Sequence, residues 1–374
     1  MFMFLMWVGL LLIFLSFVAG SAMLWNTARI PKTKGGVSTD KVSVIIPARN
    51  EEGRIGPLLQ SLLSQTNPAL EIIVVDDHST DRTVAESRAY GVTVLEAKYS
   101  KQLEWQGKSA ACWLGAKYAS GELLLFLDAD TRLEHSGSLA SLIGQYISDG
   151  ASGILSVQPY HHIKKFYENF SVIFNIIVLA GMNGFSCLKE RIKPAGAFGP
   201  CILCRKDQYF EVGGHETVGE AIMDDIVLGE IFMKKGLPVQ LKTGHGCIQF
   251  RMYAEGMLRL IEGWTKGFAT AATSTHRFIL ILISLWMTGA FLIPIQLAIS
   301  IWVGFSHWSI LLAGIYLLFY GHLVWLARKV GHFSPYVLTL FPLFFLFFTA
   351  LFIRSIYLTK VHKEVRWKGR NVKV

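Results

Sequence analysis

Two carboxylates separated by one residue end the stretch of residues 122–130, which reads Glu-Leu-Leu-Leu-Phe-Leu-Asp-Ala-Asp. The apolar run predicts a buried strand, and the carboxyl ends of such strands open into the polar cleft where α/β sheets hold ligands. A carboxylate beside apolar side chains is costly to bury unless a positive group lies there. Mg²⁺ or Mn²⁺ prefers such oxygen ligands and completes its coordination with phosphate and water. Asp128 and Asp130 therefore indicate a metal site where one carboxylate binds the cation and the other a sugar or ribose hydroxyl, and a surface turn is the alternative.

A second acidic group follows residues 71–75, which also predict a buried strand. From residue 76 it reads Asp-Asp-His-Ser-Thr-Asp, and its last three residues are typical of a helix cap. Asp77 could accept a hydrogen bond from the N–H of a uracil ring, although a turn with a cap would also explain the loop. Lys108, which follows Gly107, could offset the charge of a phosphate, or it could be a solvated lysine.

The elements around these residues alternate between strand and helix. Residues 42–46 predict a first strand that stops at Pro47, and residues 92–95 predict a third strand before a helix that begins at Gly107 and Lys108. A helix between the first two strands is predicted by apolar residues at helical spacing, namely Ile55, Leu58, Leu59, Leu62 and Leu63. Strand, helix and strand at this spacing imply a parallel sheet with right-handed crossovers. The chain is thus predicted to be α/β, with acidic groups at strand ends.

The composition points to a membrane protein. Of the 374 residues 52% are hydrophobic, and the mean hydropathy of +0.41 is too high for a soluble enzyme of this charge content. The net charge of +9 comes from basic residues near hydrophobic segments, which favours a lipid surface over nucleic acid as the partner. Five cysteines at irregular spacing, with Cys201 and Cys204 as a lone pair, indicate reduced thiols rather than a disulfide framework or a zinc site.

The ends of the chain carry the hydrophobic segments. Residues 2–24 are long enough to span a bilayer, and the basic residues that follow place the next domain in the cytoplasm by the positive-inside rule. We therefore expect an N-terminal anchor over residues 1–26, a linker over 31–40 and a cytoplasmic catalytic domain over 37–270. A C-terminal transmembrane region over 278–358 and a basic cytoplasmic tail over 359–374 complete the predicted organisation.

The number of crossings is left open by the sequence. Three apolar stretches, at residues 278–303, 310–327 and 336–358, would together place the basic tail outside, so one of them is re-entrant or residues 170–185 cross as well. Residues 170–185 are short and interrupted, and they predict either a helix on the bilayer surface that feeds a lipid acceptor to the cleft or a core helix. Trp264, with the basic residues around it, predicts a second interfacial helix.

The strand-end motifs together resemble family 2 of the glycosyltransferases, which have the GT-A nucleotide-sugar fold. The motifs are Val42-Ser-Val-Ile-Ile-Pro-Ala-Arg-Asn-Glu-Glu, Val74-Val-Asp-Asp-His-Ser-Thr-Asp-Arg-Thr, Gly107-Lys108 and Leu127-Asp-Ala-Asp. The resemblance implies a divalent metal, Mg or Mn, at Asp130 and Asp128, and an acceptor-side catalytic carboxylate at Asp225 with Asp224 beside it. The donor-binding residues that it implies are Pro47, Arg49, Glu51, Asp77, Lys108 and Asp128. Asp224 and Asp225 could instead be a plain surface pair on a helix.

The rest of the chain resembles members of this family that attach glucose to a C30 carotenoid acid in staphyloxanthin-type pathways. The resemblance lies in segments such as Ser156-Val-Gln-Pro-Tyr-His, Ala197-Phe-Gly-Pro and Phe250-Arg-Met-Tyr-Ala-Glu-Gly. It implies UDP-glucose as donor, 4,4'-diaponeurosporenoate as lipophilic acceptor, and the cell membrane as location. One departure is that many membrane members carry Gln-x-x-Arg-Trp before the C-terminal spans, where this chain has Leu260 and Gly263 before Trp264.

The expected reaction is an in-line attack on the anomeric carbon of the donor. A hydroxyl acceptor would need a base, whereas a carboxylic acid titrates near pH ~4 and already arrives as an anion. Asp225 would then hold geometry, or it indicates a hydroxyl acceptor. Another membrane lipid as acceptor remains the alternative within enzymes. An inactive scaffold or transport component is disfavoured because Asp77, Asp128 and Asp130 are all present.

Overall fold

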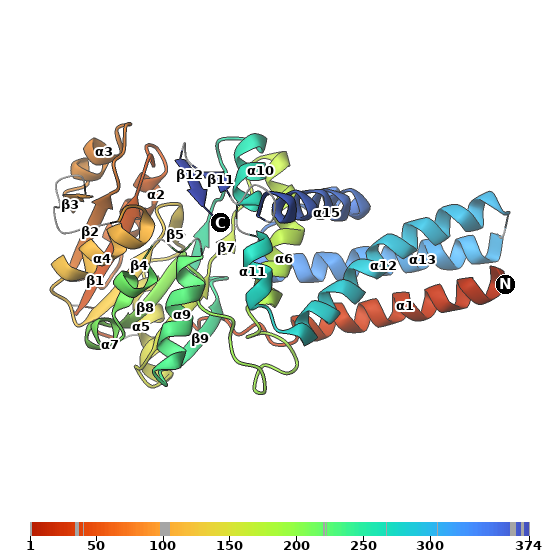
Figure 1. Ribbon diagram of the computed structural model, residues 1–374, viewed down its shortest axis with the longest axis horizontal. Coiled ribbons are helices and arrows are strands. Elements are labelled where there is room, and N and C mark those ends of the chain that lie inside the picture. The colour runs from red at the N-terminus through yellow and green to blue at the C-terminus, as the bar shows by residue number, and fades with distance from the viewer. Residues whose placement is uncertain are drawn as a thin grey trace. The chain divides into compact units, whose positions relative to one another are not determined.

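The computed structural model describes residues 2–33, 37–39, 41–97, 105–219, 221, 223–266, 268–304, 306–359, 364–367 and 370–373. The chain forms two compact units (Figure 1). The sheet unit comprises Ala28–His161 and Pro194–Met252, and the helical unit comprises Met1–Thr27, His162–Lys193 and Tyr253–Val374. Part of the predicted tail, including Lys368 and Gly369, lies outside the described residues, as do Lys34 and Asp40 of the predicted linker.

The sheet unit is built on a mixed sheet in the described part of the chain. Its seven strands lie in the order β3-β2-β1-β4-β8-β6-β9. The strands are β1 (Val42–Ala48), β2 (Glu71–Asp76), β3 (Thr93–Glu96), β4 (Leu123–Leu127), β6 (Ile154–Gln158), β8 (Cys201–Arg205) and β9 (Val239–Thr243). Neighbours among β3, β2, β1 and β4 are parallel, and β8 is antiparallel to both β4 and β6. The predicted parallel α/β arrangement is therefore confirmed for the part of the sheet that carries the acidic motifs.

Helices connect these strands as the apolar spacing predicted. The described helices of the sheet unit are α2 (Ile55–Leu63), α3 (Thr83–Ala89), α4 (Lys108–Tyr118), α5 (Ser138–Ser148), α7 (Lys206–Glu211), α8 (Gly214–Val218) and α9 (Asp224–Lys234). A smaller sheet pairs β5 (Thr131–Leu133), β10 (Ile248–Phe250) and β7 (Tyr160–His161). The predicted helices after β1 and at Lys108 are both confirmed.

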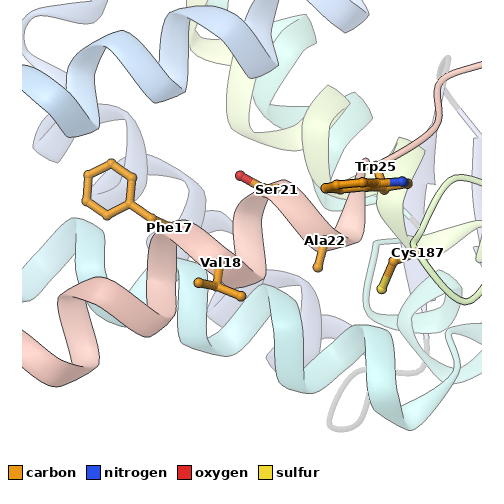
Figure 2. Close-up of a pocket in the computed structure, with 6 residues that line it drawn as sticks. All are labelled: Phe17, Val18, Ser21, Ala22, Trp25 and Cys187. Atoms are coloured by element: carbon orange, nitrogen blue, oxygen red, sulfur yellow. The ribbon is translucent and has the colours of Figure 1, made fainter.

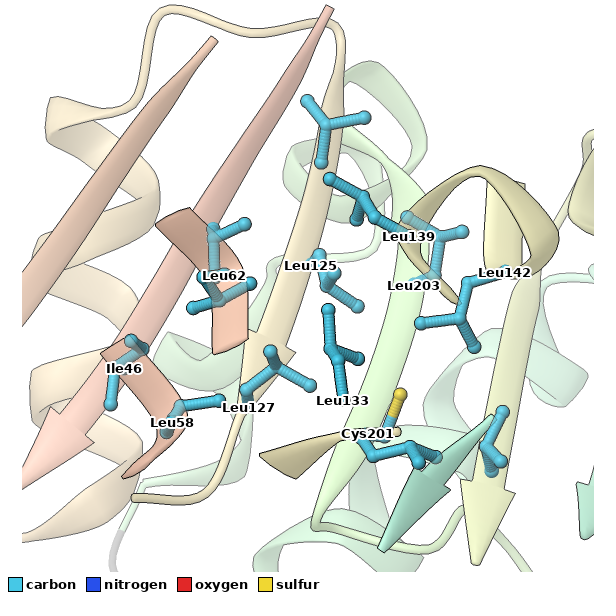
Figure 3. Packing of buried hydrophobic residues seen from close by; sticks show 14 of the residues in the cluster. Ile46, Leu58, Leu62, Leu125, Leu127, Leu133, Leu139, Leu142, Cys201 and Leu203 are labelled. Carbon is cyan, nitrogen blue, oxygen red and sulfur yellow. The ribbon is translucent and has the colours of Figure 1, made fainter. Parts of the chain in front are cut away.

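The core of the sheet unit lies between the strands and α2 and α5. Leucine side chains from β4, α2 and α5 interdigitate there (Figure 3). Leu58, Leu125 and Leu142 are fully buried, and each such side chain contributes roughly 1.5–3 kcal/mol on leaving water. On the other side of the sheet α4 approaches β1 closely, because a Cβ on Gly115 would meet Ile45 Cγ2 at 2.5 Å. The central strands are buried on both faces, as continuous apolar runs predict.

The prediction that β1 stops at Pro47 is wrong. The strand continues through Pro47 and Ala48, which pair with Val75 and Asp76 of β2. The pairing of β1 with β4 ends earlier, at Ile45. Pro47 therefore has a partner strand on one side only, a position at which proline is tolerated because no ladder hydrogen bond is lost there.

The helical unit contains the apolar segments. Its described elements are α1 (Phe2–Met23), η2 (Phe166–Ser171), α6 (Val172–Gly181), α10 (Met257–Thr265), α11 (Phe268–Ser274), α12 (Arg277–Trp302), α13 (Ser306–Val330), α14 (Pro335–Leu338), α15 (Phe341–Tyr357), β11 (Glu364–Trp367) and β12 (Arg370–Lys373). Among the described helices, three are long and apolar enough to cross a membrane, at Met3–Met23, Arg277–Trp302 and His307–Val330. The last predicted stretch divides into α14 and the 17-residue α15, which is shorter than a usual span.

Small residues bring α1 against its neighbours in the helical unit. A Cβ on Gly20 would lie 2.6 Å from Trp286 Cδ1 of α12 and 2.5 Å from His322 Cε1 of α13. A Cβ on Gly289 of α12 would collide with the Ser16 side chain. Apolar helices in lipid associate through such close backbone approach, because lipid gives them no hydrophobic driving force.

Two helices were predicted to lie on the bilayer surface, and both place buried side chains inside the helical unit. Eight of the ten residues of α6 are buried, because the helix is apolar all round and packs among the other helices of its unit. Trp264 of α10 is also buried: its ring stacks on Phe174 at 4.7 Å and its indole N–H donates to Ser171 Oγ. The Trp264 ring therefore packs inside the helical unit, while the interfacial helix expected for this segment stays a prediction.

Candidate active site

The acidic motifs lie at the carboxyl ends of β1, β2 and β4 in the sheet unit. Asp77 follows β2 and donates its backbone N–H to Ala48 O of β1 at 2.8 Å. Asp128 follows β4, and its backbone N–H donates to Pro200 O at 3.1 Å. Parallel neighbours bring these ends to one edge of the sheet. The predicted common edge is present.

A lysine lies between two of the predicted carboxylates. Lys108 Nζ lies 2.9 Å from Asp128 Oδ1 and donates to Asp225 Oδ2 at 3.2 Å. Gly107, with φ at +106°, allows the turn that begins α4 with this lysine. Asp225, from the first turn of α9, fits because residue 199 is glycine: a Cβ there would collide with its carboxyl group. Lys108 thus neutralises carboxylates of the chain itself.

Burial and charge shift the pKa values of this group. Burial raises the pKa of Asp225 to about 8, helped by the negative charge of Asp224 and opposed by Lys108. Burial disfavours the charged form of Lys108, but the carboxylates of Asp128, Asp225 and Asp224 raise its pKa well above the usual value. Burial and the charge of Asp224 therefore favour the protonated form of Asp225, whereas the neighbouring carboxylates favour the charged form of Lys108.

Asp130 belongs to a second ion-pair group, which contains a residue that the sequence did not single out. Arg54, just before α2, lies 3.4 Å from Asp130 Oδ2 and 3.3 Å from Glu51 Oε2. The Glu51 backbone N–H donates to Thr83 Oγ1 at 2.8 Å, which ties the loop after β1 to the start of α3. The sequence signal that could have identified Arg54 was its place soon after Asn-Glu-Glu. Its partner Asp130, however, is distant in the sequence.

Asp77 contacts the loop after β1. Arg49 Nη1 donates to the Asp77 backbone carbonyl at 3.2 Å and to Oδ2 at 3.4 Å, while His78 Nδ1 lies 3.1 Å from Oδ1. Asn50 and His78 both have positive φ, at 52° and 59°. Non-glycine residues in that conformation are held by their surroundings and gather at functional loops. Asp81 Oδ1 accepts the Thr83 N–H at 3.0 Å just before α3, but the N-cap residue of that helix is Arg82, whose side chain makes no cap hydrogen bond.

The donor set at the strand end fits a divalent cation held partly by a ligand. Among the described residues there is no group of three or more His, Cys, Asp or Glu side chains that could hold a metal on its own. Asp128 and Asp130 supply two carboxylates that are 29% and 19% exposed, each beside a basic side chain. Hard carboxylate oxygens suit Mg²⁺ or Mn²⁺, which keep other positions for phosphate and water. The metal site at Asp128 and Asp130 stays a prediction.

The structure brings together two of the predicted groups around basic partners. Lys108, Asp128 and Asp225 form one, and Asp77 with Arg49 forms another. Glu51 joins Asp130 through Arg54, whereas Pro47 contributes only its position at the end of β1.

Comparisons with known proteins identify the family and the fold of the chain. Residues 43–207 match the model of glycosyl transferase family 2. The chain belongs to this family and is a glycosyltransferase with the GT-A fold. It is 38% identical over 359 residues to a 4,4'-diaponeurosporenoate glycosyltransferase of Staphylococcus aureus strain N315, covering 96% of this chain and 95% of the other. The protein of that name from strain MRSA252 matches with the same identity and coverage.

A solved structure shows the same fold. The mannosyltransferase PcManGT from Pyrobaculum calidifontis, in complex with GDP-Man and Mn²⁺, matches with a TM-score of 0.52 and 18% identity. The match covers 96% of this chain and 97% of that one. The predicted family and fold are confirmed, while the roles of the individual site residues stay predictions.

The departure from the Gln-x-x-Arg-Trp signature has a local explanation in the helical unit. A Cβ on Gly263 would collide with the ring of Tyr253. An arginine at this position would therefore displace Tyr253, whose backbone carbonyl accepts a hydrogen bond from Tyr167 Oη at 2.8 Å. Glycine at 263 and the tyrosine ring are complementary in shape.

Proposed function

We propose that this glycosyltransferase transfers glucose from UDP-glucose to the carboxylate of 4,4'-diaponeurosporenoate, a C30 carotenoid acid, and gives a glucosyl ester. The observation that carries the proposal is the 38% identity to enzymes of that name over 96% of the chain, which includes both the sheet unit and the apolar helices. Similarity confined to residues 43–207 would support a sugar-nucleotide domain alone.

The donor binds at the carboxyl edge of β1, β2 and β4 in this proposal. Asp77, held by Arg49, accepts from the uracil N–H, and the loop from Pro47 to Glu51 shapes the nucleotide side. Asp128 and Asp130 hold a divalent cation, Mg²⁺ or Mn²⁺, which when bound neutralises the charge of the diphosphate. Lys108 then exchanges its carboxylate partners for a phosphate oxygen, since its pKa keeps it cationic.

The acceptor needs no base. A carboxylate oxygen forms the bond to the anomeric carbon, the bond from that carbon to the diphosphate oxygen breaks, and UDP leaves with the electron pair. No proton is released in this step. Asp225, with Asp224 beside it, positions the acceptor: a carboxyl group whose pKa is raised to about 8 stays neutral near pH 7, and can donate a hydrogen bond to an anionic acceptor rather than repel it.

The proposal includes the arrangement in the membrane. With α1, α12 and α13 as spans, α1 leads from the outer side to the domain proposed within residues 37–270. The pair α12 and α13 leaves that side and returns to it. The tail over residues 359–374 then lies on the same side as Arg29 and Lys32, which follow α1, in agreement with the positive-inside rule. The enzyme is a multi-pass cell-membrane protein with a cytoplasmic catalytic domain.

The test is the chemistry of the product. Membranes that contain the enzyme are incubated with labelled UDP-glucose, Mg²⁺ or Mn²⁺, and the C30 acid. The expected product carries label, requires the acid, and loses glucose in mild alkali because it is an ester. A labelled product that resists alkali, or one that forms on endogenous lipids without the acid, would assign the enzyme to another lipid acceptor instead.

A further inference from the structure

An apolar pocket of about 410 Å³ lies along the end of α1 in the helical unit (Figure 2). It is lined by Phe17, Val18, Ser21, Ala22, Trp25 and Cys187. None of these six side chains is charged, so the lining does not select one ligand. The sheet unit contains a feature with more defined chemistry, the segment of residues 196–200, which contacts two aspartates of the candidate active site.

The segment of residues 196–200, which reads Gly-Ala-Phe-Gly-Pro, bridges these two aspartates. At one end the Pro200 carbonyl accepts the backbone N–H of Asp128 at 3.1 Å. Near the other end the Ala197 N–H donates to the backbone carbonyl of Asp225 at 3.4 Å. The spacing between the two aspartates therefore depends on where this segment lies.

Close packing couples the segment to α9, which carries Asp225 in its first turn. A Cβ on Gly196 would lie 2.5 Å from Ile226 Cα, and a Cβ on Gly229 of α9 would lie 2.6 Å from the Ala197 nitrogen. These are contacts of backbone with backbone, which no side-chain rotation can relieve. A displacement of the segment is therefore passed on to α9, because close-packed interiors transmit strain.

Ser156 of β6 holds the centre of the segment. The residue is fully buried, and its Oγ accepts the backbone N–H of Phe198 at 2.6 Å and donates to the carbonyl of the same residue at 3.1 Å. None of the five residues of the segment lies in a helix or a strand, so their backbone polar groups need partners of another kind. One hydroxyl group thus binds both polar backbone groups of Phe198 and ties the segment to the sheet.

We propose that Ser156 is a positioning residue for glycosyl transfer, which sets the spacing between Asp128 and Asp225 through the backbone of Phe198. The inference rests on the proposed function, in which Asp128 belongs to the donor side and Asp225 to the acceptor side. An in-line attack requires the acceptor and the anomeric carbon to be aligned, and a misplacement of about 1 Å costs roughly 10²-fold in rate. Alanine at position 156 removes both hydrogen bonds and releases the segment.

Ser156→Ala tests the inference, and Ser43→Ala is the matched control. Ser43 is also fully buried in the same sheet, and its Oγ donates to Glu71 Oε1 at 2.6 Å and accepts the Gly121 N–H at 2.8 Å. It lies at the start of β1, whereas the acidic motifs follow the carboxyl ends of the strands. We expect Ser156→Ala to lower kcat per folded enzyme at least about tenfold, with KM for UDP-glucose within about twofold. Equal kcat values in the two variants would make Ser156 a structural residue and overturn the inference.

A double-mutant cycle tests whether Ser156 acts through Asp225. Asp225→Ala removes the acceptor-side carboxyl group, so adding Ser156→Ala should lower kcat by less than about twofold more, because residues that act as a unit are not additive. Adding Ser43→Ala serves as the control for general loss of stability. If Ser156→Ala costs as much in the Asp225→Ala enzyme as in the wild type, the two residues act independently and the inference is overturned.

Hydrogen exchange of the full-length enzyme separates this inference from the proposed function, since it needs no acceptor. The backbone N–H groups of Asp128 and Ala197 should exchange faster in Ser156→Ala than in the wild type, and Ser43→Ala should leave both unchanged. Faster exchange at both groups, without glucose transfer to the C30 acid by the wild type, would refute the proposed function and keep the role of Ser156. Unchanged exchange at either group would overturn the inference, and glucose transfer by the wild type would then still support the function.

Discussion

Lys108 and Asp225 are 117 positions apart in the sequence, yet Nζ lies 3.2 Å from Oδ2. The sequence identified both residues separately, because one begins a helix after glycine and the other follows a second aspartate. It could not pair them, since their contact depends on how α4 and α9 pack in the sheet unit. Arg54 was missed for the same reason: its partner Asp130 is on a different element. Asp128 and Asp130 were predictable because their signal, an apolar strand that ends in two carboxylates, is entirely local.

The proposed metal site gives the first residue-scale prediction. Asp130→Ala should lower glucose transfer roughly 10³-fold at any concentration of Mg²⁺ or Mn²⁺, because the loss of a charge-stabilising group costs about that much in the transition state. Initial rates at saturating UDP-glucose measure the effect. Asp207→Ala is the control, since Asp207 is exposed and its carboxylate pairs with Arg205, two positions before it. Turnover retained by Asp130→Ala at ordinary metal concentrations would remove Asp130 from the site.

The raised pKa of Asp225 predicts a pH dependence of stability in the ligand-free enzyme. The carboxyl titrates near pH 4 when unfolded and at about 8 when folded, so the folded state binds the proton more tightly. This group's contribution is therefore most favourable below pH 4 and is lost as the pH rises from about 4 to about 8. Asp225→Asn should flatten that decline in Tm between pH 5 and pH 8. Asp207→Asn should not, because Arg205 lowers the pKa of Asp207 and its titration falls below this range. An unchanged slope in Asp225→Asn would contradict the shift.

At the scale of elements, predictability follows how local the determining forces are. The helix α2 was predicted from its apolar spacing, because it buries one face against the sheet. The strand β4 was predicted from its apolar run, because it is buried on both faces within the sheet. The helix α6 was not, because apolar side chains all round it fit either a membrane surface or a core. Whether α6 is buried depends on the helices that pack against it, and these are distant in the sequence. The ring of Phe348 in α15, for example, has its centre 4.9 Å from that of Phe174 in α6.

The close approach of α4 to β1 gives a prediction at this scale. Gly115→Val should destabilise the protein by about 3 kcal/mol, because a Cβ there meets Ile45 Cγ2 at 2.5 Å and Val75 Cγ2 at 3.1 Å in a well-packed core. Denaturant unfolding of the purified enzyme in detergent measures the change. Gly137→Val is the matched control in the same unit, since a Cβ there meets nothing closer than 3.5 Å. Similar losses in both variants would mean that the effect is one of glycine replacement, not of packing.

At the scale of the whole molecule, the sequence left the number of membrane crossings undecided because hydropathy alone treats residues 336–358 as one stretch. The structure divides them into α14 and a 17-residue α15 that packs against α10, α11 and α12 of the helical unit. Three described helices remain as candidate spans. If α1 crosses once and α12 and α13 cross as a pair, the basic tail lies on the same side as the basic residues after α1. The conflict between the tail and the positive-inside rule is then removed.

This arrangement predicts which positions face outward. Trp302, at the end of α12, is 88% exposed, and Lys41 lies in the sheet unit with its side chain 62% exposed. In a Cys187→Ser background, which removes the exposed native thiol, Trp302→Cys should react with a membrane-impermeant maleimide in intact cells. Lys41→Cys should react only after permeabilisation, because the proposed orientation puts the basic residues after α1 in the cytoplasm. Labelling of Lys41→Cys in intact cells would invert the orientation. Protection of both cysteines in intact cells would instead mean that α12 and α13 do not cross, and that α1 alone anchors the enzyme.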